Sequence, residues 1–374
     1  MANILMAAIL AVFIALFLAP HANGACLCEN PAWCAPIAGQ RVKEIVAFTS
    51  GTANMKKYDW ASLTTIVGAA DPLLVCEAHS HGVRMLLSAD FNFSNLVNAT
   101  ARSAWVEQHV AKANAIHADG SNFDYEAPLN ASDPRVASLV ALMQETKDAF
   151  HAHVGPDTLV VADMPWSPSN IDGRFYDVVG MAQAVDLFFV MSYCLRSQVY
   201  DRCIASAGSG LPGIQLGIEQ YVTLGVPKEK LVMGLTWGGL DYSCVGTKPG
   251  EAKDAGLFCP IQPVEFYGAP CSDLVAFPGA NYDKIMALSK ANAAVRQWEP
   301  VLASPYFNYV NASGDVHQVW YDDAQSLTVK NEMAKGMGVR GVGVFYLDAL
   351  DYSSTDPAVQ EENKKMYASL AAFL

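Results

Sequence analysis

The hydrophobic pattern of this chain alternates between two periods. Short apolar runs rich in β-branched residues predict strands, and the longer segments between them carry apolar residues at helical spacing. The predicted strands span residues 44–49, 64–69, 84–89, 121–126, 158–164, 186–193, 231–237 and 342–347. Repeats of this kind predict an α/β fold, a closed (β/α)8 TIM barrel, whose active site lies at the C-terminal ends of the strands.

The segment between the fourth and fifth strands shows the helical period most clearly. Val136, Leu139, Val140, Met143 and Phe150 recur on one helical face. The helix is expected to begin after Asp133 as N-cap, with Pro134 in its first turn. A crossover helix at this place fits a parallel barrel.

The last two predicted strands are separated by about a hundred residues, far more than an ordinary crossover needs. Residues from about 241 to 321 are rich in Gly, Pro, Tyr and Cys, which predicts a disulfide-braced insertion on the mouth of the barrel. With no low-complexity linker or internal repeat, residues 25–374 are expected to form one domain that carries this insertion.

The amino-terminal residues resemble a targeting segment. An apolar stretch from Ile4 to Pro20 is followed by small residues before Ala25, so residues 1–24 are expected to be a cleaved signal peptide. No Lys or Arg precedes the apolar stretch, which leaves an uncleaved anchor as the alternative. Entry into the secretory route makes four sequons meaningful as glycosylation sites, namely Asn92, Asn98, Asn130 and Asn311.

The nine cysteines then predict disulfides in an oxidising compartment, and their odd number leaves one thiol unpaired. Cys26, Cys28 and Cys34 lie close together, but no second Cys/His pair stands at zinc spacing, so disulfides are favoured over a metal site. The pair His79 and His81 is interpreted as part of a solvated turn. The cysteine connectivity cannot be read from the sequence.

Charge and motifs exclude several function classes. A net charge of −13 and a pI near 5.0 argue against nucleic acid and anionic membranes as partners. No phosphate-binding loop, dinucleotide fingerprint or catalytic Ser/His/Asp order is present, so no cofactor is expected. We expect a monomer.

The octet from Asp119 to Glu126 carries the strongest chemical signal. Strand-like alternation would put Asn122, Asp124 and Glu126 on one face, with the two carboxylates ~6.6 Å apart at Cα. At that distance one charge raises the pKa of the other, which suits a proton-transfer pair. A buried hydrogen-bond network would give the same alternation, and a calcium site would need a different ligand spacing.

These residues resemble a known family. The octet is similar to the D-x-x-D-x-D-x-E signature of glycoside hydrolase family 18. Met191-Ser192-Tyr193 and the segment Tyr321-Asp322-Asp323 with Ser326 resemble two further motifs of that family. Other segments that resemble its branch acting on chitobiose cores lie at 58–60, 78–80, 166–172, 231–234, 241–244, 268–273 and 317–320. The resemblance thus extends over nearly the whole mature chain.

The resemblance implies a retaining glycosidase for β-1,4-linked N-acetylglucosamine that uses the substrate's acetamide as nucleophile. Glu126 would be the general acid, Asp124 would orient the acetamide, Tyr193 would hold its oxygen, and Asp119 would be a buried support. The implied substrate is the reducing-end chitobiose core of freed Asn-linked oligosaccharides, in the lysosome or outside the cell. A secreted chitinase and a sugar-binding lectin are the alternatives.

Three positions depart from the family pattern. Asn122 stands where most members have Asp, which is expected to leave the pKa of Asp124 lower. Cys194 replaces the Asp that commonly follows Tyr193, and is the best candidate for the unpaired cysteine. Phe345 stands where the family places a Trp under the sugar, and it can still stack on a ring.

Further substrate contacts are expected from large or polar side chains near the strand ends. Trp166 and Trp237 could stack on sugar rings, and Asp241 or Tyr242 could bind hydroxyl groups. Core packing is an equally good explanation for the two Trp residues, because large aromatics are mostly buried whatever their role.

Overall fold

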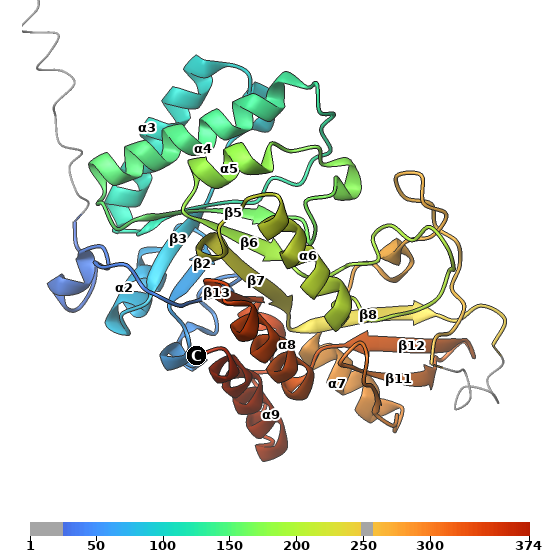
Figure 1. Ribbon diagram of the computed structural model, residues 1–374. Coiled ribbons are helices and arrows are strands. Elements are labelled where there is room, and N and C mark those ends of the chain that lie inside the picture. Colours follow the sequence, from blue (N-terminus) through green and yellow to red (C-terminus); the bar gives the residue numbers. More distant parts are fainter. Residues whose placement is uncertain (1–24, 248–256) are drawn as a thin grey trace, which may run out of the picture.

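The computed structural model describes residues 25–247 and 257–374 (Figure 1). Residues 1–24, for which a signal peptide is predicted, lie outside the described residues. None of the helices in the two described ranges is both long enough and apolar enough to cross a bilayer.

A closed parallel barrel forms the main body of the molecule. Its strands follow the order β1-β2-β3-β4-β5-β6-β7-β13, and β13 pairs with β1 to close the ring. They are β1 Glu44–Phe48, β2 Thr65–Gly68, β3 Arg84–Ser88, β4 Gly120–Phe123, β5 Leu159–Met164, β6 Leu187–Met191, β7 Leu231–Thr236 and β13 Gly341–Phe345. The predicted TIM barrel is therefore confirmed, and each strand lies within a residue or a few of its predicted range.

The fourth and sixth strands end earlier than predicted. β4 ends at Phe123, whose last ladder partner on β5 is Ala162, so Asp124 and Glu126 lie in the loop beyond it. β6 likewise ends at Met191, two residues before Tyr193. The alternation of exposed and buried side chains nevertheless continues past the end of β4, since Asp124 and Glu126 are exposed and Tyr125 between them is buried.

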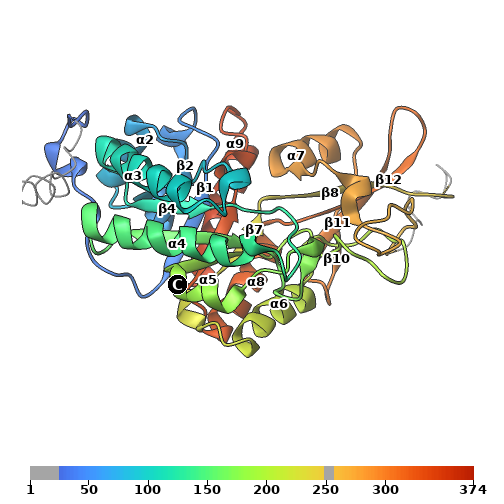
Figure 2. The ribbon, with the colours of Figure 1, turned by 90° about the horizontal axis from the view of Figure 1, so that it is seen from above.

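Helices surround the barrel and cover the outer faces of its strands (Figures 1 and 2). They are α2 Pro72–Ser80, α3 Ala99–Ile116, α4 Pro134–His153, α5 Val178–Ala184, α6 Leu211–Thr223, α8 Ala324–Met337 and α9 Pro357–Ala368. α4 begins as predicted, because the Asp133 carboxylate accepts a hydrogen bond from the backbone N–H of Arg135 at 2.9 Å. Leu139, Met143 and Phe150 are buried on its inner face.

Apolar side chains fill the inside of the barrel. The cluster contains Val46, Val67, Leu86, Leu159, Val161, Leu187, Phe189 and Val232. Phe189 is the largest of them, and a Cβ atom built on Gly234 or Gly343 would overlap its ring. Two neighbouring strands therefore need glycine at these positions so that one aromatic ring can occupy the interior.

The segment between β7 and β13 forms a second, antiparallel sheet beside the mouth of the barrel (Figure 2). Its strand order is β10-β11-β12-β8-β9, and α7 Tyr282–Ala291 packs against it. The strands are β8 Gly238–Ser243, β9 Ala280–Asn281, β10 Gln297–Glu299, β11 Ser304–Val310 and β12 Val316–Tyr321. The insertion expected at about 241–321 thus begins three residues earlier, with the first residue of β8.

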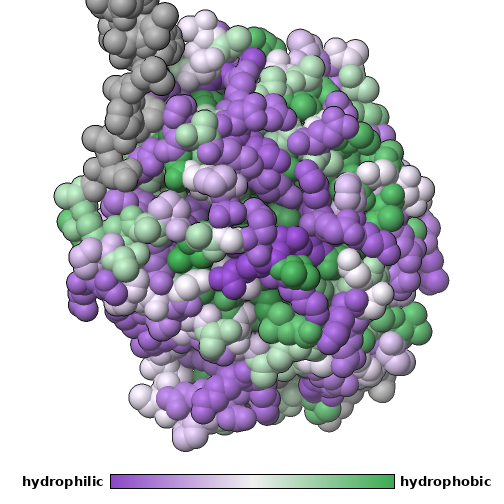
Figure 3. All heavy atoms as spheres, turned by 60° about the vertical axis from the view of Figure 1, so that its left-hand side comes forward, coloured by the Kyte–Doolittle hydropathy of each residue, from purple (hydrophilic) through white to green (hydrophobic). Residues whose placement is uncertain are grey.

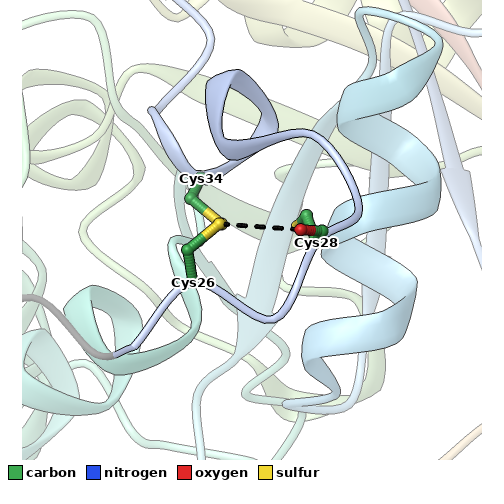
Figure 4. A group of neighbouring side chains, drawn as sticks. All are labelled: Cys26, Cys28 and Cys34. Carbon is green, nitrogen blue, oxygen red and sulfur yellow. Dashed lines mark hydrogen bonds between the residues drawn. A yellow bond between two sulfur atoms is a disulfide. The ribbon is translucent and has the colours of Figure 1, made fainter.

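Four disulfides brace the described chain, two across short separations of 8 and 15 residues and two across longer ones of 48 and 68. The described residues form the pairs Cys26–Cys34, Cys28–Cys76, Cys203–Cys271 and Cys244–Cys259, and Cys194 is free as expected. Figure 4 shows the three amino-terminal cysteines close together, with the Cys26–Cys34 bond beside Cys28. Their closeness results from two disulfides, as the sequence indicated.

The surface is mixed in character. On the face shown in Figure 3, hydrophilic residues predominate and hydrophobic residues are scattered among them. Asn92, Asn98 and Asn130 are exposed, and Asn311 is half-buried in the turn between β11 and β12. Glycosylation at these four positions stays a prediction.

Candidate active site

A cavity of about 730 Å³ lies at the C-terminal mouth of the barrel. Residues at the ends of the barrel strands form its floor, and residues of the inserted sheet and its loops form one wall. Of the residues expected from the sequence, Asn122, Asp124, Glu126, Trp166, Tyr193, Cys194 and Phe345 line this cavity. Position in the barrel and sequence pattern therefore agree on the location of the site.

Asn122 joins the fourth strand to the fifth. Its amide Nδ2 donates a hydrogen bond to Asp163 Oδ2 at 2.8 Å, and both side chains are buried. Burial raises the pKa of Asp163 well above its usual range, and the charge of Asp124 adds to this effect. Sequence reasoning missed Asp163, although a lone carboxylate in the otherwise apolar strand Leu159–Met164 is the signal that could have found it.

Asp124 lies between Asp163 and Glu126. Its side chain is open to the cavity, yet the surrounding protein raises its pKa to about 6 by burial, with the charge of Glu126 adding and Arg174 opposing. The expectation that Asn122 leaves this pKa lower than an Asp at the same position would stays a prediction, because the rise comes from burial and from Glu126. The neighbouring strand supplies a carboxyl group, Asp163, close to the amide that replaces the family's Asp.

Glu126 is held by an arginine that the sequence analysis did not predict. Arg174 Nη2 donates to Glu126 Oε2 at 2.7 Å, and Arg174 Nε donates to the backbone oxygen of Glu126 at 2.9 Å. The Glu126 side chain is 48% exposed, whereas Arg174 is nearly buried. Arg174 lies two residues beyond the segment 166–172 that resembles the family. That resemblance could draw attention to this part of the chain, but it could not predict the contact of Arg174 with Glu126.

An aromatic floor lies beside these carboxyl groups. Tyr193 and Phe345 stack with ring centroids 5.7 Å apart and planes inclined by 19°, and Phe48 packs edge-on against Phe345. Phe345 is 40% exposed and faces the cavity. Burial raises the pKa of Tyr193 well above its usual range, so its hydroxyl is a neutral hydrogen-bond group.

Three residues expected to contact substrate do not line the cavity. Trp237 is 1% exposed and packs edge-on against Tyr367, so packing explains it. Asp241 accepts a hydrogen bond from the Tyr309 hydroxyl at 2.7 Å and pairs with His317 within the inserted sheet. Tyr242 is fully buried. Trp237 and Tyr242 point into the protein, whereas Asp241 lies on the opposite face of β8 from Tyr242 and is held by its contacts within the inserted sheet.

Asp119 is buried at the start of β4, at the opposite end of the strand from the cavity. It accepts hydrogen bonds from the backbone N–H groups of Ile37 and Met85, and contacts His79 Nε2, all at 2.7 Å. It therefore supports the start of the strand and not its end. The interpretation of His79 as part of a solvated turn is wrong, because its ring is buried against Asp119.

The segment from Tyr321 to Lys330 fastens the end of the inserted sheet to the barrel. Asp322 and Lys330 form a fully buried ion pair, and the Ser326 hydroxyl donates to Asp322 at 2.7 Å. Asp323 caps α8. This family-like motif is thus mainly structural, although Asp322 also borders the cavity.

Within the described residues, the only group of three potential metal-ligand side chains with their ligand atoms close together is Cys26, Cys28 and Cys34, which are in disulfides. The cavity's carboxyl groups are farther apart than such a group requires.

Comparisons with known proteins agree with this geometry. A model of the glycosyl hydrolases family 18 matches residues 32–349. The chain is 37% identical to the di-N-acetylchitobiase of Mus musculus over 355 residues, covering 94% of each protein. It is 35% identical to the di-N-acetylchitobiase of Homo sapiens, covering 92% of this chain and 88% of that one.

Solved structures show the same fold. A class V chitinase from Nicotiana tobaccum superposes with a TM-score of 0.68 at 18% identity, covering 90% of this chain and all of that one. A family 18 chitinase from Cycas revoluta in complex with (GlcNAc)3 has a TM-score of 0.67 at 18% identity, covering 87% and 99%. Since the family model spans most of the chain and the two relatives are 35% and 37% identical over nearly all of it, the chain belongs to the glycosyl hydrolases of family 18 and is a glycoside hydrolase.

Proposed function

We propose that this hydrolase cleaves β-1,4-linked N-acetylglucosamine with retention, using the substrate's own acetamide as the nucleophile. The observation that carries the proposal is the meeting of Asp124, Glu126 and Tyr193 in one cavity above an aromatic floor. The names of the relatives, di-N-acetylchitobiases, support this substrate class.

Glu126 is the general acid in this proposal. Its half-exposed carboxyl group can reach a glycosidic oxygen that enters the cavity, and it later takes a proton from the attacking water. In the free protein, Arg174 donates a hydrogen bond to the Glu126 carboxylate. The glycosidic oxygen must therefore displace or share this contact, so Arg174 positions the acid.

Asp124 and Tyr193 act on the acetamide. Ionised Asp124 accepts the acetamide N–H and stabilises the positive charge of the cyclic intermediate, while the Tyr193 hydroxyl donates to the acetamide oxygen. With a pKa of about 6, Asp124 changes charge within the mildly acidic range. Phe345 and Phe48 provide the apolar surface on which the sugar ring lies.

We further infer that the bond cleaved lies at the reducing end of short oligosaccharides, and that the protein acts in the lysosome or outside the cell. The first inference rests on the resemblance of the sequence to the branch of the family that acts on chitobiose cores. The second rests on the disulfides, which form in oxidising compartments, and on the predicted signal peptide.

The test is hydrolysis of chitotriose at acidic pH, with its reducing end either free or chemically reduced. Glu126→Gln removes the acid and should lower the rate on the order of a hundredfold or more. The exposed Glu107 on α3 supplies a matched control, and Glu107→Gln should keep the wild-type rate.

Cleavage that requires the free end supports the reducing-end specificity. Equal cleavage of both substrates would assign a chitinase instead. If the protein binds the sugars but cleaves neither substrate, the proposal of an enzyme is wrong and the protein is a sugar-binding lectin.

A further inference from the structure

One wall of the cavity contains buried carboxyl oxygens that have no hydrogen-bond partner within the described residues. Asp273 comes from the inserted segment and is 1% exposed, and neither of its carboxyl oxygens has a hydrogen-bond partner within the described residues. Asp172, from the loop after β5, likewise has an unpartnered buried Oδ1. Both residues line the cavity.

An unpartnered buried carboxyl group is costly, so the protein must gain something by keeping it. Burial raises the pKa of Asp273 to about 7, and the charge of Asp172 adds to this effect. Burial also raises the pKa of Asp172. Arg174 lies 3.6 Å from Asp172 Oδ2, but Asp172 Oδ1 and both oxygens of Asp273 have no hydrogen-bond partner within the described residues. A hydrogen-bond donor that reached these oxygens would stabilise them.

A series of contacts leads from Glu126 to this wall. Asp163 is outside that series and interacts electrostatically with Asp124 and Glu126. Glu126 contacts Arg174 at 2.7 Å, and Arg174 lies 3.6 Å from Asp172. Besides burial, the charge of Asp172 in turn raises the pKa of Asp273. Cys194 lines the same cavity, and burial and then the charge of Asp273 raise the pKa of its thiol.

This series of contacts has a chemical meaning if Glu126 protonates the bridging oxygen. The sugar whose acetamide meets Asp124 and Tyr193 then lies on one side of Glu126, and the sugar that departs lies on the other. The departing sugar is the one that reaches Asp172 and Asp273.

We propose that Asp172 and Asp273 form the binding subsite for the departing sugar and accept hydrogen bonds from its hydroxyl groups. The inference rests on the proposed function and deepens it, because it assigns recognition of the leaving group to a wall that the insertion completes. The unpartnered oxygens are the acceptors that a sugar rich in hydroxyl groups would fill.

The experiment compares two substrates that share the N-acetylglucosamine unit and differ in the leaving group. One is the β-1,4-linked N-acetylglucosamine disaccharide, and the other is an aryl β-N-acetylglucosaminide whose leaving group carries no sugar hydroxyls. Asp273→Ala should raise KM for the disaccharide by about tenfold, because the sugar loses one or two buried hydrogen bonds. It should leave kcat/KM for the aryl substrate within about threefold of wild type.

Three variants frame this result. Asp273→Asn keeps an acceptor oxygen and should retain most of the affinity for the disaccharide. Asp172→Ala should resemble Asp273→Ala, so that the subsite is tested even where one variant folds poorly. Asp148→Ala, on the exposed face of α4, is the control and should change neither substrate.

An equal loss on both substrates, or no loss on the disaccharide, would overturn the subsite. Failure of the proposed function looks different, because the wild-type protein would then hydrolyse neither substrate or Glu126→Gln would remain active on both.

Discussion

At the scale of single residues, the site separates its carboxyl groups by environment. Asp163 is fully buried and hydrogen-bonded to Asn122, Asp124 is enclosed but open to the cavity, and Glu126 is half exposed against Arg174. The surrounding protein raises the pKa values of Asp163 and of Asp124. Different environments let chemically similar groups take different roles in one reaction.

Arg174 should influence the pH dependence through Asp124. Its positive charge lowers the pKa of Asp124, so Arg174→Gln should raise that pKa further. Because the ionised form of Asp124 is the active one in our proposal, activity falls as the pH drops through its pKa. The acidic limb of the kcat/KM profile should therefore move to higher pH in the variant.

The profile can be recorded with the aryl substrate, for which departure of the leaving group needs little acid assistance. Arg135→Gln, at the start of α4 and away from the cavity, should leave the limb unchanged. A limb that stays in place or moves to lower pH in Arg174→Gln would show that Asp124 does not govern it.

Residue types and spacing predicted part of this site. The octet located Asp124 and Glu126 and the tripeptide located Tyr193, because these residues follow strands that a pattern can recognise. The same reasoning could not separate Trp166, which lines the cavity, from Trp237, which is in the core. Which way a side chain points at a strand end depends on its neighbours in space.

At the scale of elements, the barrel is defined by periodicity and by caps. The eight strands and the start of α4 followed from the apolar pattern and from Asp133. The inserted sheet did not, because its pairings join distant residues, such as Asp241 with Val319. Antiparallel partners brought together across such a distance leave no local signal.

The packing around Phe189 gives a prediction at this scale. Gly343→Ala places a methyl group against the Phe189 ring and the backbone of Val46, so it should lower the free energy of unfolding by roughly 1–3 kcal/mol. Gly336, exposed in the last turn of α8, has open space around its Cα, and Gly336→Ala should instead stabilise by about 0.5 kcal/mol.

Chemical denaturation of both variants beside wild type measures the difference. Both variants replace Gly by Ala. Changes of opposite sign in the free energy of unfolding would therefore be due to the different surroundings of the two positions. A Gly343→Ala variant as stable as wild type would mean that Phe189 can move aside without cost.

At the scale of the whole molecule, the barrel supplies the proposed chemistry and the insertion supplies one wall. Arg174 and Asp273 lie in loops whose positions depend on how β5, β6 and the inserted sheet come together. Neither was predicted as a functional residue. Their roles follow from contacts and missing contacts, which only the folded chain reveals.

The cavity's carboxyl groups also link global stability to pH. The folded pKa values of Asp124, Asp163, Asp172 and Asp273 lie above those of an unfolded chain. The folded state therefore binds more protons, and stability present below about pH 4 is lost as the pH rises through about 6 and 7 for Asp124 and Asp273. Tm should be higher at pH 5.5 than at pH 8, by several degrees.

One buried histidine works in the opposite direction. Burial lowers the pKa of His109 to about 4, so its contribution to stability is lost as the pH falls from 6.5 toward 4. Calorimetry over pH 5 to 8 measures the balance, and Asp273→Asn should flatten the decline on the alkaline side. A Tm that rises steadily toward pH 8 would contradict the carboxyl contribution.

The position of Asp273 outside the barrel has a consequence for how such an enzyme can change over generations. Substitutions in the inserted segment can alter which partner sugar is accepted without touching the groups that break the bond. Selection can therefore change the substrate specificity of the enzyme and its catalytic rate through substitutions in different parts of the chain.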